Sequence, residues 1–227
     1  MTQGAYDTIA EWYENTFLTG QRVQHDGKVA DPLGIEHALD MLLGGGTGPC
    51  LDIGCGTGIF AEQIGRLGWE PVGIDLSGPM LRFAASRLPV ARADAGALPV
   101  RDASVPAAVA IMTHTDMPNY ASVVAEVARV LRPGGSFVHI GVHPCFCGGF
   151  ADRSNADAIV IGPGYADQHW TKASWTNQGL RDKVGAFHLP LPHLLRMFVE
   201  NGLILEDFIE GGEPTPIVLA VKARKAL

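Results

Sequence analysis

The chain of 227 residues is long enough to fold as one domain with a core that is stable unaided. Hydrophobic residues make up 47% and charged residues 18%, which excludes a disordered chain, and the net charge of −7 argues against a nucleic-acid partner. No apolar run approaches the ~20 residues of a membrane span. The N-terminus lacks the basic region of a signal peptide, and the four cysteines lack disulfide-framework spacing. We therefore expect a cytoplasmic protein that is not bound to a membrane.

Apolar periodicity and glycine or proline breaks predict the elements in chain order. Helices are predicted at 5–18 and 33–43, before the first strand. Strands then alternate with helices: strands at 49–54, 70–77, 89–94, 105–112 and 136–143, and helices at 59–68, 78–87 and 120–131. The segment 144–188 is rich in glycine and aromatic residues and is predicted to be irregular, and the chain ends with a helix at 191–202 and strands at 203–210 and 216–223. This order predicts a mostly parallel α/β sheet with helices on both faces and a ligand at the carboxyl ends of its strands.

The stretch "LDIGCGTG" (51–58) places three glycines directly after a buried strand, at Gly54, Gly56 and Gly58. Glycine permits positive φ and lets the backbone approach a ligand, so a strand–loop–helix of this kind is typical of a nucleotide site. A dinucleotide site requires G-x-G-x-x-G, but Ile59 stands where the third glycine belongs. The dehydrogenase pattern therefore fails by one position.

Three acidic residues, Asp52, Asp75 and Asp94, end the first three predicted strands. A carboxylate at Asp75 can accept both hydroxyls of a ribose, and Asp94 can accept from the amine of adenine. Asp52 is unfavourable beside a pyrophosphate and favours a cationic group, although it could instead cap the loop. Asp94 could likewise be a turn residue. An adenosine with a cationic, amino-bearing tail describes S-adenosylmethionine.

Four blocks in order, "LDIGCGTG", "GIDLSGPML", "ADAGALP" and "VARVLRPGGSFV", resemble a class I S-adenosylmethionine-dependent methyltransferase of the small ubiquinone/menaquinone-methyltransferase-like group. The C-terminal "HLPLPHLLRMFVENGLILEDFIE" also resembles the last helix and strand of that group. The resemblance implies a Rossmann-like, doubly wound, seven-stranded sheet whose last strand is antiparallel. It also implies S-adenosyl-L-methionine as cofactor and S-adenosyl-L-homocysteine as product. The expected parts of the single domain (1–227) are an N-terminal helical lid at 1–45, a cofactor-binding core at 46–143, a substrate-side insertion at 144–188, and the last helix and strands at 189–227.

The same resemblance assigns residues to the cofactor. It places the three glycines at the methionine part, Asp75 at the ribose, Asp94 with Ala95 at the adenine, and Met80 over the adenine face. Tyr6 and Tyr13, on the lid helix, would meet the methionine carboxylate, unless they only form an amphipathic stripe. We also assign three residues within or beside these motifs to the cofactor site, although the thiol of the first is expected to be a small filler: Cys55, Leu76 and Thr113.

His114, in "MTHTD" after the fourth strand, is the main candidate for chemistry. An imidazole there could act as a general base toward a phenol acceptor. Alternatively, it only shapes the wall of the site, which we favour slightly. His143 ends the fifth strand and is the second catalytic candidate, His188 is a candidate substrate-side residue, and His139 is expected to be packed in the core.

The remaining features leave several alternatives open. Cys145 and Cys147 form a C-x-C pair near His143, but three ligands at this crowded spacing favour no metal site. The aromatic residues of 144–188 could line a small-molecule pocket or form a satellite core: Phe146, Phe150, Tyr165, Trp170 and Trp175. We expect methyl transfer to a small, aromatic or largely apolar acceptor. An RNA or protein methyltransferase and a non-catalytic binding module are the alternatives, and a homodimer is compatible with the sequence.

Overall fold

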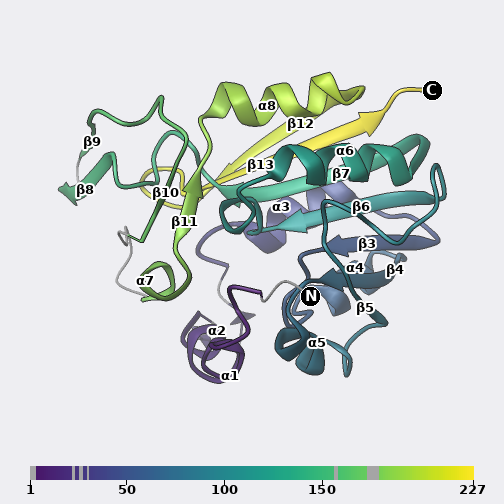
Figure 1. Cartoon of the computed structure of the whole chain (residues 1–227). Coiled ribbons are helices and arrows are strands. Elements are labelled where there is room, and N and C mark those ends of the chain that lie inside the picture. The colour runs from purple at the N-terminus through teal and green to yellow at the C-terminus, as the bar shows by residue number, and fades with distance from the viewer. Residues whose placement is uncertain (1–3, 22–23, 26–27, 30, 156–157, 173–178) are drawn as a thin grey trace.

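The computed structural model describes residues 4–21, 24–25, 28–29, 31–155, 158–172 and 179–227. Its centre is a seven-stranded sheet in the order β12-β13-β7-β6-β3-β4-β5 (Figure 1). The strands are β3 (Pro49–Ile53), β4 (Glu70–Asp75), β5 (Val90–Arg92), β6 (Val105–Ile111), β7 (Leu131–Val142), β12 (Leu203–Gly211) and β13 (Val218–Lys225). The five strands β7, β6, β3, β4 and β5 pair in parallel, and β13 pairs antiparallel with both of its neighbours, so β12 runs in the same direction as those five. The predicted seven-stranded sheet with an antiparallel last strand is confirmed.

Helices cover both faces of the sheet. The residues of α6 (Tyr120–Val130) and α8 (Leu191–Glu200) form one apolar core against the sheet. On the opposite face lie α3 (Ile35–Leu43), α4 (Ala61–Arg66) and α5 (Gly78–Ala84). The central strand β6 is buried at every position, as expected for a parallel strand covered on both sides.

Several predicted boundaries differ from the observed ones. The N-terminal helix runs later than predicted, as α1 (Ala10–Trp12), the π-helical turn η1 (Tyr13–Phe17) and α2 (Leu18–Gln21). The helix after the glycine loop is shorter, because Gly58 and the turn that follows it delay the first helical residue to Ala61. Strand β7 begins at Leu131 rather than at residue 136, since the Pro133–Gly135 bend is contained within it.

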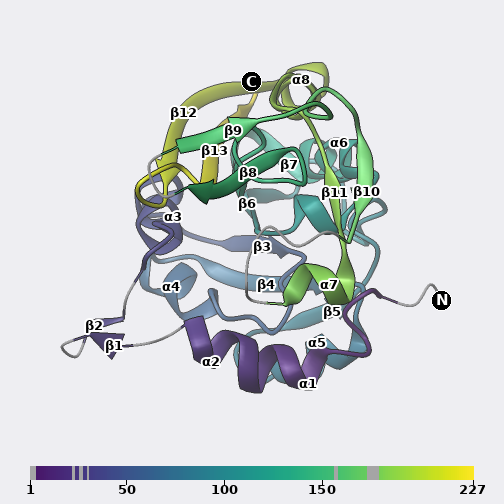
Figure 2. The same ribbon diagram turned by 90° about the vertical axis from the view of Figure 1, so that its left-hand side faces the viewer.

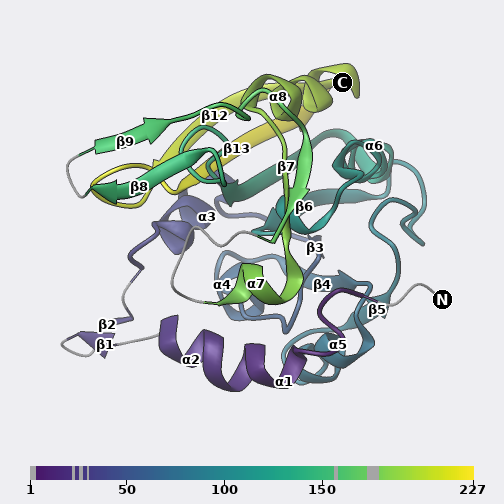
Figure 3. The same ribbon diagram turned by 60° about the vertical axis from the view of Figure 1, so that its left-hand side comes forward.

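The predicted irregular segment 144–188 contains regular elements, which corrects that expectation. It holds the hairpin β8 (Ala151–Asn155) and β9 (Ala158–Ile161), the pair β10 (His169–Thr171) and β11 (Ala186–His188), and the short helix α7 (Leu180–Val184). Short β1 (Gln24–His25) and β2 (Lys28–Val29) pair near the N-terminus. Turned views show that the N-terminal helix, α7 and β8–β11 gather at one end of the molecule (Figures 2 and 3). The parallel strands point their carboxyl ends toward this end (Figure 1), so these segments cover the edge at which a ligand was predicted.

Among the described residues, no helix is long and apolar enough to cross a membrane.

Candidate functional site

The glycine loop after β3 is shaped by contacts within the protein. Gly54, Gly56 and Gly58 all have positive φ, of 69°, 55° and 75°. A Cβ at Gly54 would lie 2.6 Å from Cγ2 of Thr113, and a Cβ at Gly58 would lie 2.5 Å from a methyl carbon of Leu88. Any larger residue at these positions would therefore be strained and would displace its neighbours.

Asp75, at the end of β4, is bound to this loop. Its Oδ2 accepts a hydrogen bond from the backbone N–H of Gly56 and its Oδ1 accepts one from that of Ser77, each at 2.8 Å. Burial raises the pKa of Asp75, and these two hydrogen bonds oppose the rise. Each carboxylate oxygen accepts more than one hydrogen bond, so Asp75 keeps acceptor capacity for a diol.

Asp52 lies on the neighbouring strand β3 and is only 1% exposed. Within the described part of the chain, its Oδ2 has no hydrogen-bond partner. Burial, together with the charge of Asp75, raises the pKa of Asp52 to about 7. A buried carboxylate oxygen without a partner is the kind of group that a cationic ligand would satisfy, and no hydrogen bond supports the capping role for this oxygen.

The other predicted cofactor residues lie around this loop. Met80 is buried in α5, and its Cε would be 3.4 Å from a Cβ on Gly56. Cys55 is buried, its Sγ fills the space beside Gly73, and burial raises the pKa of its thiol. This supports the interpretation of Cys55 as a small filler.

Beyond β4, Leu76 offers its backbone oxygen to Nε of Arg92 at 2.8 Å. Asp94 is exposed, and its Oδ1 accepts from the backbone N–H of Gly96 at 2.8 Å, while Ala95 beside it is buried. This hydrogen bond corresponds to the turn role that was the alternative for Asp94. It engages Oδ1, so Oδ2 can still accept a hydrogen bond from a ligand.

The N-terminal segment is attached to the end of β6 through Asp116. The contact is made by Tyr6, which lies in the turn before α1 and not on the helix as predicted. The hydroxyl of Tyr6 donates to Oδ2 of Asp116 at 3.0 Å, and Nη1 of Arg181 in α7 donates to Oδ1 at 2.6 Å. Burial raises the pKa of Tyr6 well above its ordinary value, which keeps it a phenol and a donor. Tyr13 packs edge-on against Tyr6, with ring centroids 5.6 Å apart. Sequence reasoning missed Asp116 and Arg181, although Asp116 belongs to the "MTHTD" stretch.

His114 begins η2 (His114–Asp116), two residues after Met112, which has an unusual φ of +56°. A residue other than glycine in this conformation is strained and redirects the chain at the end of β6. The ring of His114 is 5.0 Å from that of His139, centroid to centroid, and 5.9 Å from that of Tyr120. Burial lowers the pKa of His114 well below 6.5 and that of His139 to about 3, so both imidazoles are neutral.

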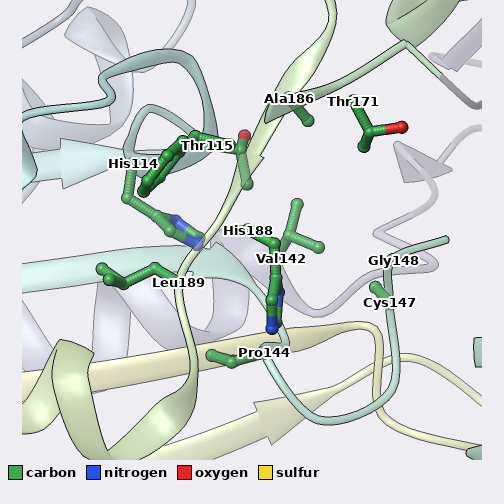
Figure 4. Close-up of a pocket in the computed structure, with 11 residues that line it drawn as sticks. His114, Thr115, Val142, Pro144, Cys147, Gly148, Thr171, Ala186, His188 and Leu189 are labelled. Atoms are coloured by element: carbon green, nitrogen blue, oxygen red, sulfur yellow. The ribbon is translucent and has the colours of Figure 1, made fainter. Parts of the chain in front are cut away.

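A small cavity of about 10 Å³, about enough for one water molecule, opens against His114 (Figure 4). Figure 4 shows the imidazole of His114 reaching from η2 toward His188 and Leu189. Most of the lining is apolar and comes from the ends of β6 and β7 and from the 144–188 segment: His114, Thr115, Val142, Pro144, Cys147, Gly148, Thr171, Ala186, Phe187, His188 and Leu189. The predicted substrate-side residue His188 and the catalytic candidate His114 therefore line one cavity.

Comparison with known proteins shows which family this region resembles. Residues 51–139 match the family model described as a methyltransferase domain. This stretch, which includes the glycine loop, Asp75 and Asp94, is similar to methyltransferase domains.

Relatives of the chain are also methyltransferases, and their sequences match only part of it. The chain is 34% identical over 93 residues to a demethylmenaquinone methyltransferase of Tropheryma whipplei, covering 39% of each chain. It is 38% identical over 96 residues to a ubiquinone biosynthesis O-methyltransferase of Albidiferax ferrireducens, covering 37% of each. The aligned region thus spans about two fifths of the length of these relatives. The fold resembles an S-adenosylmethionine-dependent methyltransferase from Mesorhizobium loti with a TM-score of 0.66 and 24% identity, over 84% of this chain and 95% of that one.

His143 is held away from His114. Its Nε2 lies 2.8 Å from Oε1 of Glu210, and its Nδ1 accepts from the backbone N–H of Cys145 at 3.1 Å. Both ring nitrogens are thus engaged, and His143 borders a separate surface cleft with Phe146. The structure does not bring the two catalytic candidates together, and a catalytic role for His143 stays a prediction.

The C-x-C pair does not assemble a ligand set. Cys145 and Cys147 are free thiols. Throughout the residues that the structure describes, no group of three or more histidine, cysteine or acidic side chains is placed to hold a metal ion. His143, the expected third member, is already hydrogen-bonded.

The aromatic residues of the insertion divide between two environments. Phe150 is buried and packs on His188, with ring centroids 4.5 Å apart, and on Tyr165 at 5.5 Å, so it forms a satellite core behind the cavity. Trp170 is 43% exposed, and Trp175 lies outside the described residues.

Proposed function

We propose that this protein transfers the methyl group of S-adenosylmethionine to a small, largely apolar acceptor, with an aromatic ring as the expected carrier of the reacting atom. One observation carries the proposal. A glycine loop with a buried carboxylate (Asp52) and a half-buried one (Asp75) meets an apolar, histidine-lined cavity at one edge of the sheet, where Thr113 and His114 follow β6. The first part suits the cofactor and the second suits the acceptor.

The cofactor residues fit S-adenosylmethionine by the chemistry of their side chains. In the proposed arrangement, Asp75 accepts the ribose hydroxyls while it remains bonded to Gly56 and Ser77. The unpartnered oxygen of Asp52 accepts from the cationic amino group. Tyr6, in the turn before α1, and Tyr13, in η1, close the site from the N-terminal segment.

The chemistry then depends mainly on alignment. The bound sulfonium supplies an electrophilic methyl group, and the protein must hold the acceptor in line with the C–S bond and exclude water. The N-terminal helix, α7 and the 144–188 segment surround this edge and provide that exclusion (Figure 2). Because the cavity holds about one water molecule, the segment that carries Cys147 and His188 must move outward to admit an acceptor.

The names of the two relatives described above support a small-molecule acceptor. One is a demethylmenaquinone methyltransferase, and the other is a ubiquinone biosynthesis O-methyltransferase. The net charge of −7 argues against RNA as the acceptor.

The proposal is tested by incubating the protein with methyl-labelled S-adenosylmethionine and three acceptor pools: a small-molecule extract, total RNA and total protein. We expect label in the small-molecule pool, and its loss with Asp75→Asn. Label confined to RNA or protein would refute a small-molecule acceptor. Calorimetric binding of S-adenosylmethionine with no transfer to any pool would indicate a non-catalytic binding module.

A further inference from the structure

The two buried histidines beside the cavity face each other with their unpartnered nitrogens. Within the described chain, Nδ1 of His114 and Nε2 of His139 are both buried and have no hydrogen-bond partner. A Cβ placed on Gly141 would lie 2.4 Å from the first nitrogen and 2.8 Å from the second, so the two nitrogens are at most 5.2 Å apart. A small ring rotation or one bridging water joins them over such a distance.

When two neutral imidazoles share a hydrogen bond, one of the two facing nitrogens donates and the other accepts. The ring protons can therefore be placed in two ways. In the first, His139 donates from Nε2 to Nδ1 of His114, so His114 carries its own proton on Nε2. In the second, His114 donates from Nδ1, and its Nε2 is a bare base. The first arrangement makes His114 a hydrogen-bond donor toward the cavity, and the second makes it a general base.

Tyr120 decides between these arrangements. Its hydroxyl lies 2.8 Å from Nδ1 of His139 and is fully buried. If His139 donated from Nδ1, the O–H of Tyr120 would need another acceptor. Thr113 is the neighbouring hydroxyl, but its contact lowers the pKa of Tyr120, as a hydroxyl that donates to the phenol oxygen does, so Thr113 does not take the proton of Tyr120. A buried O–H without an acceptor is strongly unfavourable, so Tyr120 donates to His139 and the first arrangement is favoured.

We infer that the chain Tyr120–His139–His114 fixes His114 as an N–H donor at the wall of the cavity, and that the methyl acceptor presents a carbonyl or deprotonated oxygen to it. The inference rests on the proposed function for the identity of the reaction, but not for the geometry of the chain. Tyr120 and His139 are positioning residues, since they act through His114. Gly141 leaves room for both rings, because any side chain there would collide with them.

This arrangement predicts which acceptors are excluded. An acceptor that lacks the oxygen would leave the buried N–H of His114 unpaired, and sites built around a hydrogen bond reject such analogues strongly. The acceptor must also reach the site already deprotonated or reactive as a neutral molecule, because His114 has no lone pair on Nε2 with which to take its proton.

Nuclear magnetic resonance of the whole protein with ¹⁵N-labelled histidine tests the chain directly, because long-range ¹H–¹⁵N correlations report which ring nitrogen carries the proton. The signals are assigned with His114→Gln and His139→Gln, and the exposed His37 and His193 are internal references. We expect neutral rings protonated on Nε2 at both buried positions between pH 6 and 8. A proton on Nδ1 of His114, or a charged ring there, would overturn the inference.

Tyr120→Phe tests whether Tyr120 selects the arrangement. We expect His139 to become a mixture of tautomers while the reference histidines stay unchanged, and unchanged tautomers at both buried positions would refute the relay. Binding of S-adenosylhomocysteine by the same variant verifies its fold. If the tautomers are as expected and no acceptor is methylated, the proposed function fails and the relay stands.

Where transfer is observed, His114→Gln keeps an N–H near the position of Nε2 and should retain activity within about tenfold. His114→Leu should lose far more.

Discussion

Asp52 and Asp75 end two adjacent parallel strands, yet their carboxyl groups have opposite surroundings: Asp75 accepts two backbone hydrogen bonds, whereas Oδ2 of Asp52 has no partner within the described residues. This asymmetry separates two roles at one site. A carboxylate fixed by the loop is suited to orient a diol, and an unsatisfied carboxylate is suited to a cation. Two predictions follow from this pair.

Asp75→Asn should weaken binding of S-adenosylmethionine by about 1.5–3 kcal/mol, which is roughly 10- to 150-fold, because the ribose loses hydrogen bonds to a charged group. Asparagine retains one acceptor oxygen for the loop, so the fold should be preserved. Isothermal titration calorimetry measures the change, with the exposed Asp207→Asn as a matched control. Unchanged affinity in a folded variant would remove Asp75 from the ribose site.

Binding of the cofactor should release a proton from Asp52. Without a ligand, its pKa is about 7, so about half of these groups are protonated at pH 7. A cation beside the carboxyl favours the charged form and lowers the pKa, so affinity should rise as the pH increases from 6 to 8. Calorimetry in phosphate and in Tris, which differ in ionisation enthalpy, counts the released protons. Identical enthalpies in both buffers would contradict the prediction, and Asp52→Asn should abolish the difference.

The sequence could predict that Asp75 lies beside the glycine loop because the information for this pairing is local. The three glycines and the acids at strand ends recur at fixed distances along alternating strands and helices, and parallel strands bring those ends together. Asp75 and the glycine loop therefore could be assigned before the fold was known, and their direct hydrogen bond agrees with that assignment.

The acceptor half depends on contacts between distant segments. Asp116 meets Tyr6 from 110 residues away and Arg181 from 65 residues away, and no periodicity reports such pairs. His139 could be recognised as a packed residue, but its alignment with His114 depends on the register of β6 and β7 and on Gly141. The short strands of 144–188 lack clear alternation, so their pairing could not be predicted.

Hydrogen exchange should be slower in residues 4–21 when S-adenosylhomocysteine is bound, because Tyr6 and Tyr13 then contact the ligand as well as Asp116. Exchange is measured by mass spectrometry with and without the ligand. Tyr6→Phe removes the hydroxyl bound to Asp116 and should speed exchange in this segment, whereas Tyr165→Phe, in the insertion, should not. Equal protection with and without ligand would exclude the N-terminal helix as a lid.

Gly141→Ala should destabilise the protein by about 1–3 kcal/mol, since the new Cβ would collide with His114 and His139. Gly65→Ala is the matched control, because it lies in α4 with nothing within 4 Å of the new Cβ, and it should stabilise by about 0.5–1 kcal/mol. Urea unfolding gives both values. A neutral Gly141→Ala would mean that the two rings can separate freely.

His114 and His139 should make the protein sensitive to acid. Both have a folded pKa below the ordinary value of 6.5, so the unfolded chain binds more protons at mildly acidic pH. Their contribution to stability is fully present above about pH 6.5 and is lost as the pH falls, by up to about 1.4 kcal/mol per pH unit for each ring. Asp52 acts in the opposite direction, because its raised pKa makes the folded state bind more protons, but it does so equally in every histidine variant.

The free energy of unfolding should therefore depend less steeply on pH between 6 and 4 in His114→Gln and in His139→Gln than in the parent protein. The exposed His193→Gln is the matched control and should keep the parent slope. Urea unfolding at several pH values measures the slopes. A variant that loses stability equally at every pH, with the parent slope intact, would show that the replaced histidine is charged in the folded protein, and its role as a neutral member of the relay would be withdrawn.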